Sequence, residues 1–200
     1  MIFFKNLFKS FSTKVNTNNL LCGIGDSEIH ENTILISNYP FEPSFAHPEK
    51  LIKAIEIDAI CVDFGALKIK IKDDIVFVSV EKKDALKTFA EKNNIPLIPH
   101  SWNWDWILEP YLDTEFTEEN NKRVTARLLE NGFSKIEINT IRKEVGKQMY
   151  KYNFDTMLWD WCSLSLFDVL SAMRAKYSKE EFREFYKRAI EIEKRKKTVS

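Results

Sequence analysis

Residues 57–80, IDAICVDFGALKIKIKDDIVFVSV, contain three strand patterns in succession. The first pattern, 57–64, is apolar and rich in strand-forming residues apart from its aspartates. The second, 67–72, alternates aliphatic residues with lysines, so we expect the lysines to face water and the aliphatic side chains to face a core. The third, 75–80, is almost continuously apolar, as a central strand is. A glycine and an Asp-Asp pair between the patterns mark tight connections, which predicts an antiparallel meander.

Shorter patterns surround this meander. On its N-terminal side, 33–37 predicts a strand, and 48–56 predicts a helix that Pro48 opens. On its C-terminal side, 84–93 predicts a second helix. The stretch 95–98 predicts a short strand at a sheet edge, because it contains a proline.

After Pro99 the pattern becomes helical. Regularly spaced apolar residues predict helices at 118–131, from 134 to about 152, at 164–176, and from 178 to the basic end of the chain. The second and the last of these helices open with Ser-x-x-Glu, the pattern of a capping box.

These patterns predict the α+β fold class, with a small mixed β-sheet and flanking helices in the N-terminal half and a helical C-terminal half. We expect residues 1–30 to form an N-terminal amphipathic segment and loop, and 31–100 to form a mixed α/β part. Residues 101–200 should form a helical part packed on it, in one compact body.

Composition and charge narrow the classes of partner. Lysine plus arginine and aspartate plus glutamate number 30 each, so the formal net charge is zero and we expect no nucleic-acid partner. The three cysteines lie far apart without metal-binding spacing, which favours a reducing compartment and a cytoplasmic location. Residues 1–15 place apolar side chains at helical spacing among lysines. Docking on the protein's own domain and contact with a membrane surface both fit that segment, and docking is the commoner case.

The tryptophans point to a binding surface. All five lie in two clusters that each contain Trp-Asp-Trp, at 104–106 and 159–161, and 101–121 contain acidic residues but no lysine or arginine. Aromatic side chains anchor many protein interfaces, and carboxylates complement a basic partner. We therefore expect a surface for another protein, one with a basic face, formed by Trp102, Trp104, Asp105, Trp106, Glu109, Asp113 and Glu115. Such binding suits an inhibitory or immunity-type protein.

A second interpretation of the same tryptophans is structural. The two clusters could pack together and join the sheet half of the molecule to the helical half. If 102–106 is extended, its tryptophans share one face and could form a stacking platform for bases or a sugar, but the acidic neighbours disfavour nucleic acid.

The predicted order helix, strand, strand, strand, helix, strand over 48–98 resembles the core of the PD-(D/E)xK nucleases. The resemblance implies an acidic residue on the second core strand and an acid-x-Lys motif on the third, which together hold a divalent metal and position water. In this chain it implies Asp58 or Asp63 for the first acid, with Glu81 and Lys83 for the motif. The family motif lies inside its strand, whereas Glu81 and Lys83 follow the end of theirs.

A second acidic set includes a histidine. His100, Asp113 and Glu115 are suitable ligands for a divalent metal, and with Asp105 they suit a general acid–base pair. Asp113 also fits a helix cap. Because each catalytic pattern is partial, we predict a protein-binding protein without catalytic activity or cofactor. The alternative is a metal-dependent hydrolase, of the nuclease-like kind, that uses a divalent metal.

Overall fold

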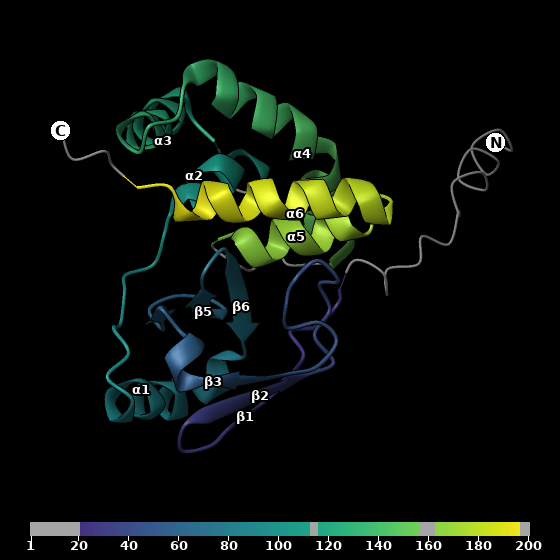
Figure 1. The fold of residues 1–200 in the computed structure, drawn as a ribbon. Coiled ribbons are helices and arrows are strands. Elements are labelled where there is room, and N and C mark those ends of the chain that lie inside the picture. The colour runs from purple at the N-terminus through teal and green to yellow at the C-terminus, as the bar shows by residue number, and fades with distance from the viewer. Residues whose placement is uncertain (1–20, 113–115, 157–162, 197–200) are drawn as a thin grey trace, which may run out of the picture.

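The computed structural model describes residues 21–112, 116–156 and 163–196 (Figure 1). Two three-stranded antiparallel sheets lie in the N-terminal half, and helices α2 to α6 lie above them in the view of Figure 1. The α+β fold class is therefore confirmed. Most of the predicted N-terminal amphipathic segment, including 1–15, and the second tryptophan cluster lie outside the described residues.

The elements follow the chain in a simple order. The first sheet consists of β1 (Asp26–Ile29), β2 (Thr33–Ser37) and β3 (Lys50–Lys53), and the second consists of β4 (Ala59–Cys61), β5 (Leu67–Ile71) and β6 (Asp74–Val78). The helices are α1 (Lys83–Lys92), α2 (Asn103–Leu108), α3 (Glu118–Glu130), α4 (Lys135–Thr156), α5 (Leu166–Arg174) and α6 (Lys179–Lys194). The 3-10 helices among the described residues are η2 (Ala54–Glu56), η3 (Val80–Lys82) and η4 (Glu109–Tyr111).

The predicted meander forms the second sheet. Its strands pair in the order β4, β5, β6, with Ile69 of β5 lying between Ile60 and Val76. The predicted strand at 95–98 is reduced to one parallel bridge, in which Leu97 pairs with Ile60. That bridge covers the outer edge of β4 and is the parallel component of an otherwise antiparallel arrangement among the described residues.

The other edge of this sheet, β6, is covered by a side chain. The hydroxyl of Tyr39 accepts a hydrogen bond from the main-chain N–H of Phe77 (3.0 Å) and donates one to the oxygen of Ile75 (3.4 Å). Tyr39 is 1 % exposed. A buried tyrosine thus pairs with main-chain groups that an edge strand would otherwise leave open to another chain.

The predicted helix at 48–56 is wrong. Lys50–Lys53 instead forms β3, where Ile52 lies opposite Ile34 of β2, and η2 follows it. Leu51 is 50 % exposed while Ile52 is completely buried, which is the alternation of a strand. Pairing with β2 outweighs the local helical pattern, because tertiary contacts routinely override intrinsic propensity.

The expectation that the lysines of β5 face water is wrong for Lys68. This residue is 7 % exposed, and its ammonium group lies beside Glu193 of α6. The helical half covers the sheet face that carries Lys68. Although the sequence of β5 alternates apolar and polar residues, the strand is therefore largely buried on both faces.

Both predicted capping boxes are confirmed. At the start of α4, the N–H of Glu137 donates to the hydroxyl of Ser134 (3.1 Å), and the N–H of Ser134 donates back to the Glu137 carboxylate (3.4 Å). Ser178 and Glu181 exchange the same bonds at the start of α6, at 3.3 and 2.9 Å. Each box provides acceptors for N–H groups that a helix start leaves unpaired.

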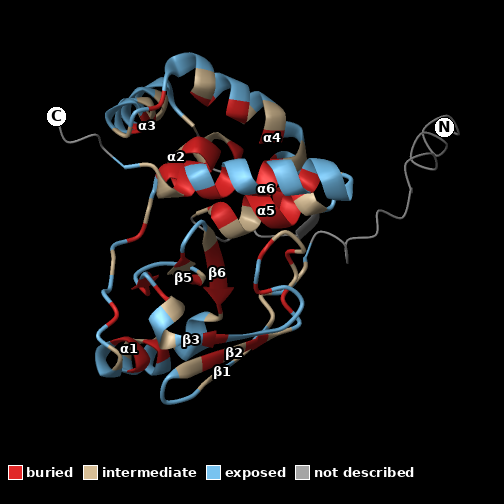
Figure 2. Ribbon diagram, viewed as in Figure 1, coloured by how far each residue is buried: buried red, intermediate tan, exposed pale blue. Residues whose placement is uncertain are grey.

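One cluster of buried apolar side chains includes residues of both halves. Phe41 lies where they meet, with its ring centroid 5.9 Å from that of Phe77 in β6 and 5.7 Å from that of Phe167 in α5. In Figure 2 the buried residues follow β6 and the inner face of α6, while α3 and α4 are mostly exposed on their outer sides. Among the described helices, none combines the length and apolar character needed to cross a membrane.

Candidate functional site

The first tryptophan cluster fixes α2 within the helical half of the molecule. It enters α2 at Asn103, so 102–106 is mainly helical rather than extended. Trp104 is completely buried, and its indole N–H donates to the main-chain oxygen of Ala189 in α6 (2.9 Å). The side-chain amide of Asn103 donates to two main-chain oxygens at the C-terminal end of α6, at 2.8 Å each. These bonds attach α2 firmly to α6.

The expectation that Trp104 and Asp105 face solvent is therefore wrong, because the turn of α2 directs both inwards. Trp104 packs inside the helical half, against α6. The predicted packing of the two tryptophan clusters on each other stays a prediction, because the second cluster lies outside the described residues. Trp106 is half-buried and packs against the core.

The other residues of the expected surface are dispersed. The carboxylate of Glu109 pairs with Arg123 at 2.8 Å. Asp113 and Glu115 lie outside the described residues. Trp102 is 42 % exposed, which makes it the most accessible of the described tryptophans.

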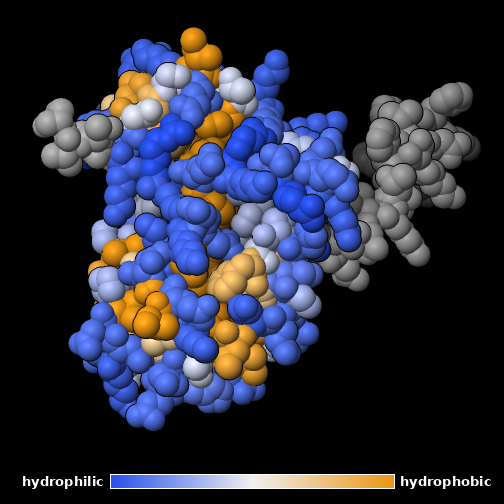
Figure 3. Space-filling model, in the orientation of Figure 1, coloured by the Kyte–Doolittle hydropathy of each residue, from blue (hydrophilic) through white to orange (hydrophobic). Residues whose placement is uncertain are grey.

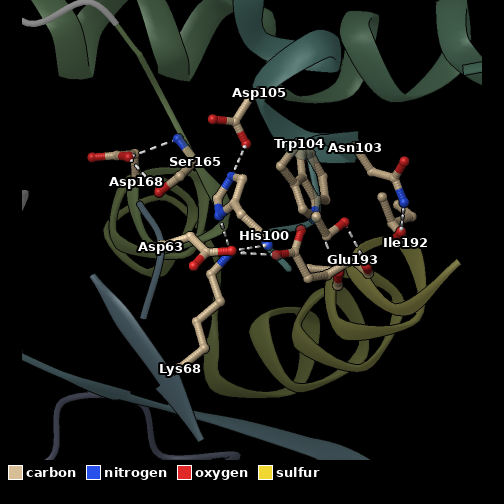
Figure 4. A network of polar contacts seen from close by, with 12 residues as sticks. Asp63, Lys68, His100, Asn103, Trp104, Asp105, Ser165, Asp168, Ile192 and Glu193 are labelled. Atoms are coloured by element: carbon tan, nitrogen blue, oxygen red, sulfur yellow. Dashed lines mark hydrogen bonds and ion pairs between the residues drawn. The ribbon is translucent and has the colours of Figure 1, made fainter. Parts of the chain in front are cut away.

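A buried polar network surrounds His100, as Figure 4 shows. Nε2 of His100 lies 3.0 Å from Oδ2 of Asp105, and its Nδ1 lies 3.3 Å from Nζ of Lys68. Nζ of Lys68 also donates to Oε1 of Glu193 at 2.5 Å. The main-chain N–H of His100 donates to Oδ2 of Asp63 at 3.3 Å. The network thus connects β5, the chain before α2, α2 itself and α6.

Each buried acid of this network has a basic neighbour. Burial disfavours protonation of His100, but hydrogen bonds to Asp105 and to the Cys61 side chain outweigh burial and raise the pKa of His100 to about 9. Burial raises the pKa of the Glu193 carboxyl, and the nearby Lys68 opposes that shift. The network thus sets two basic side chains, His100 and Lys68, beside two acidic ones, Asp105 and Glu193, and such pairing is how polar groups of this kind are retained in an interior.

The geometry of the network suits structural support. The side chain of His100 is 2 % exposed, so a substrate in solution does not reach it in this conformation. Among the described residues, none donates to Oδ1 of Asp105 or to Oε2 of Glu193. An unsatisfied buried acceptor costs roughly 1–3 kcal/mol, so Lys68 and His100 provide the stabilisation that keeps these acids inside.

Two aromatic side chains cover His100 on its outer side. The ring centroids of Trp102 and Phe64 lie 4.7 and 5.4 Å from that of the imidazole, and 5.3 Å from each other. Phe64 is 40 % exposed, similar to Trp102. Gly65 follows with φ +61°, a conformation that glycine adopts readily and that turns the chain directly after Phe64. Phe64, Trp102 and the neighbouring exposed Asp63 are called the aromatic patch below.

The structure gives the residues of the nuclease-like prediction separate roles. Asp58 accepts a hydrogen bond from a main-chain N–H in the β5–β6 turn, and Asp63 accepts one from His100. Glu81 binds a neighbouring serine hydroxyl, and Lys83 begins α1. Across residues 21–112, 116–156 and 163–196, no group of three or more His, Cys, Asp or Glu side chains is placed to hold a metal ion. The first helix of the predicted nuclease core is also replaced by β3.

The second metal prediction rests on His100, Asp113 and Glu115. His100 is the member of this set that the structure describes, and its ring nitrogens lie beside Asp105 and Lys68. The metal-dependent hydrolase therefore stays a prediction.

Comparisons of the chain with known protein families, with curated proteins and with solved structures found no match. Any proposal about the function of this protein therefore rests on the geometry of the described residues.

Sequence reasoning missed three members of this site. Glu193 follows Ala189 and Ile190 at helical spacing on the apolar face of α6. An acidic residue on an apolar face indicates a buried cationic partner, so the sequence alone could have predicted one here. Lys68 gave no such signal, because alternation alone does not show what covers the polar face. Phe64 was assigned to a strand, and its exposure depends on the turn at Gly65.

Proposed function

We propose that this protein binds another protein through the aromatic patch of Phe64, Trp102 and Asp63. The observation that carries the proposal is a pair of aromatic rings in mutual contact, with centroids 5.3 Å apart and outer surfaces exposed. Both rings rest on His100, whose own position is fixed by Asp105 and Lys68.

Exposure of single apolar residues would not support this proposal, since it is common on protein surfaces. Ile55, for example, is 92 % exposed, and Figure 3 shows several hydrophobic patches separated by hydrophilic side chains. The aromatic patch differs because its rings contact each other and are supported from below. Aromatic side chains restrained in this way lose little conformational freedom on binding, which makes them effective anchors.

The chemistry of the patch favours a partner with lysine or arginine at its surface. A cation over the face of a tryptophan is stabilised by about 0.5–2 kcal/mol, depending on its exposure. The exposed carboxylate of Asp63 adds an acceptor for a charged hydrogen bond beside the rings. The proposed partner keeps the basic face expected from the sequence, whereas Asp63 replaces the acidic residues of 105–115 as the complementary charge.

A quantitative pull-down from a native lysate tests the proposal. Wild type, Phe64→Ala and Trp102→Ala are compared with the control Ile55→Ala, which removes an equally apolar but isolated side chain. Anchor residues typically contribute 2 kcal/mol or more, about a thirtyfold change in affinity.

We expect at least one protein to be retained by wild type and Ile55→Ala and lost from both patch variants, with weakened retention by Asp63→Asn. Thermal unfolding of each variant confirms that it is folded. If folded patch variants retain the same proteins as wild type, the proposal is refuted.

A further inference from the structure

A groove of about 350 Å³ lies between α3 and α4. These helices are at the top of Figure 1, and the groove shares no residue with the aromatic patch. Its apolar lining residues are Ala126, Leu129 and Ile138, and its cations are Lys122, Lys135 and Arg142. None of the described residues that line it is acidic. The charged residues of the lining are therefore all basic, although the chain as a whole is neutral.

Arg142 lies at one end of the groove with its charge unpaired. Its guanidinium donates to the main-chain oxygens of Trp106 (3.1 Å) and Ile107 (3.2 Å) and to Oδ1 of Asn121 (3.0 Å), all of them uncharged acceptors. Within the described ranges, no carboxylate forms an ion pair with Arg142. Burial lowers the pKa of Arg142, and the nearby Tyr111 and Glu109 oppose that shift.

The cations are spaced along the groove. Lys135 begins α4 and Arg142 is seven positions later (142 − 135), so they are roughly 10 Å apart along the helix axis. Lys122 is on α3, and its Nζ also lies 3.9 Å from Oε1 of Glu118 in an exposed pair. Ile138 is three positions after Lys135 and four before Arg142, so these three residues share one face of α4, with the apolar residue between the two cations.

We propose that this groove binds a small organic dianion whose anionic groups are roughly 10 Å apart and joined by an apolar chain. One anionic group pairs with Arg142 and Lys122, the other with Lys135, and the chain lies over the apolar lining residues. The volume favours a small molecule, because small-molecule sites typically range from about 300 to 1,000 Å³. The site is independent of the proposed protein binding, since it lies on different elements.

Calorimetric titration with nonanedioate tests the site, because this dianion has a carboxylate at each end of an alkyl chain of about the required length. Nonanoate, with one carboxylate, and butanedioate, with a short chain, are the ligand controls. Lys122→Gln and Lys135→Gln remove groove charges from exposed positions, and Lys143→Gln removes an exposed charge from α4 outside the groove.

We expect nonanedioate to bind at least about tenfold tighter than either control. Its affinity should fall by about fivefold in each groove variant, the effect of one ion pair, and stay unchanged in Lys143→Gln. Equal binding of nonanoate and nonanedioate would overturn the proposal, as would an equal loss in Lys143→Gln. Tighter binding of a capped Asp-Ala-Ala-Asp peptide than of nonanedioate would also overturn it, because the groove would then suit a protein segment.

Discussion

Replacement of Lys68 by methionine should strongly destabilise the folded protein. The side chains of Lys68 and Glu193 are 8 % and 3 % exposed, and 2.5 Å separates their charged atoms. Methionine resembles lysine in length but carries no charge, so Glu193 loses its nearest cation. Loss of one member of a buried pair typically costs about 3–5 kcal/mol. This is a large fraction of the roughly 5–15 kcal/mol that stabilises a domain.

Urea unfolding at several pH values measures this effect. Lys68 lowers the pKa of Glu193, so its removal should raise that pKa beyond the increase that burial already causes. An acid with a raised pKa in the folded state favours folding at low pH, where it is protonated, and opposes folding as pH rises through that pKa. The cost of Lys68→Met should therefore be smaller at about pH 5 than at about pH 7.

Two further variants test whether the loss of stability comes from the unpaired charge of Glu193. Lys70→Met, at a half-buried lysine on the same strand, should change stability by less than about 1 kcal/mol. The double variant Lys68→Met with Glu193→Leu removes both charges and should recover most of the loss, as apolar replacement of a buried pair often does. The reasoning fails if Lys68→Met costs less than about 1 kcal/mol, or if the double variant is as unstable as the single one.

Three other outcomes follow from the described geometry. NMR titration should give the imidazole of His100 a pKa of about 9. Because the pKa of histidine in the unfolded chain is about 6.5, the stability that His100 contributes is complete below about pH 6.5 and is lost as the pH rises towards 9. A measured pKa near 6.5 would contradict the hydrogen bond between His100 and Asp105. Trp104→Ala should cost about 3–5 kcal/mol in urea unfolding, and Trp102→Ala much less, so equal losses would contradict their different burial. Tyr39→Phe should cost about 1–3 kcal/mol, because the N–H of Phe77 loses its acceptor, and an unchanged unfolding midpoint would show that Tyr39 does not support the edge of β6.

Local patterns were enough to predict the second sheet and most helices. The alternation in 67–72 and the apolar run in 75–80 each define a strand without reference to the rest of the chain, and β5 and β6 follow them closely. The capping boxes at Ser134 and Ser178 are equally local, because both partners lie within one helical turn.

Long-range contacts decided what the sequence did not predict. Residues 50–53 form β3 because they pair with β2, and β1 is likewise set by pairing rather than by its own composition. The site depends on Lys68 meeting Glu193, which is 125 positions away in the chain. Tryptophans occupy every second position from 102 to 106, but in the helix α2 this spacing turns Trp104 into the interior.

We propose that Trp102 and Phe64 face a partner, whereas the buried Trp104 supports the interior. Hydroxyl-radical footprinting of the protein, free and bound to the captured partner, tests this most directly. We expect oxidation of Trp102 and Phe64 to fall in the complex, Ile55 to stay as reactive as in the free protein, and Trp104 to be unreactive in both states. Undiminished oxidation of Trp102 and Phe64, together with protection of another face, would contradict it.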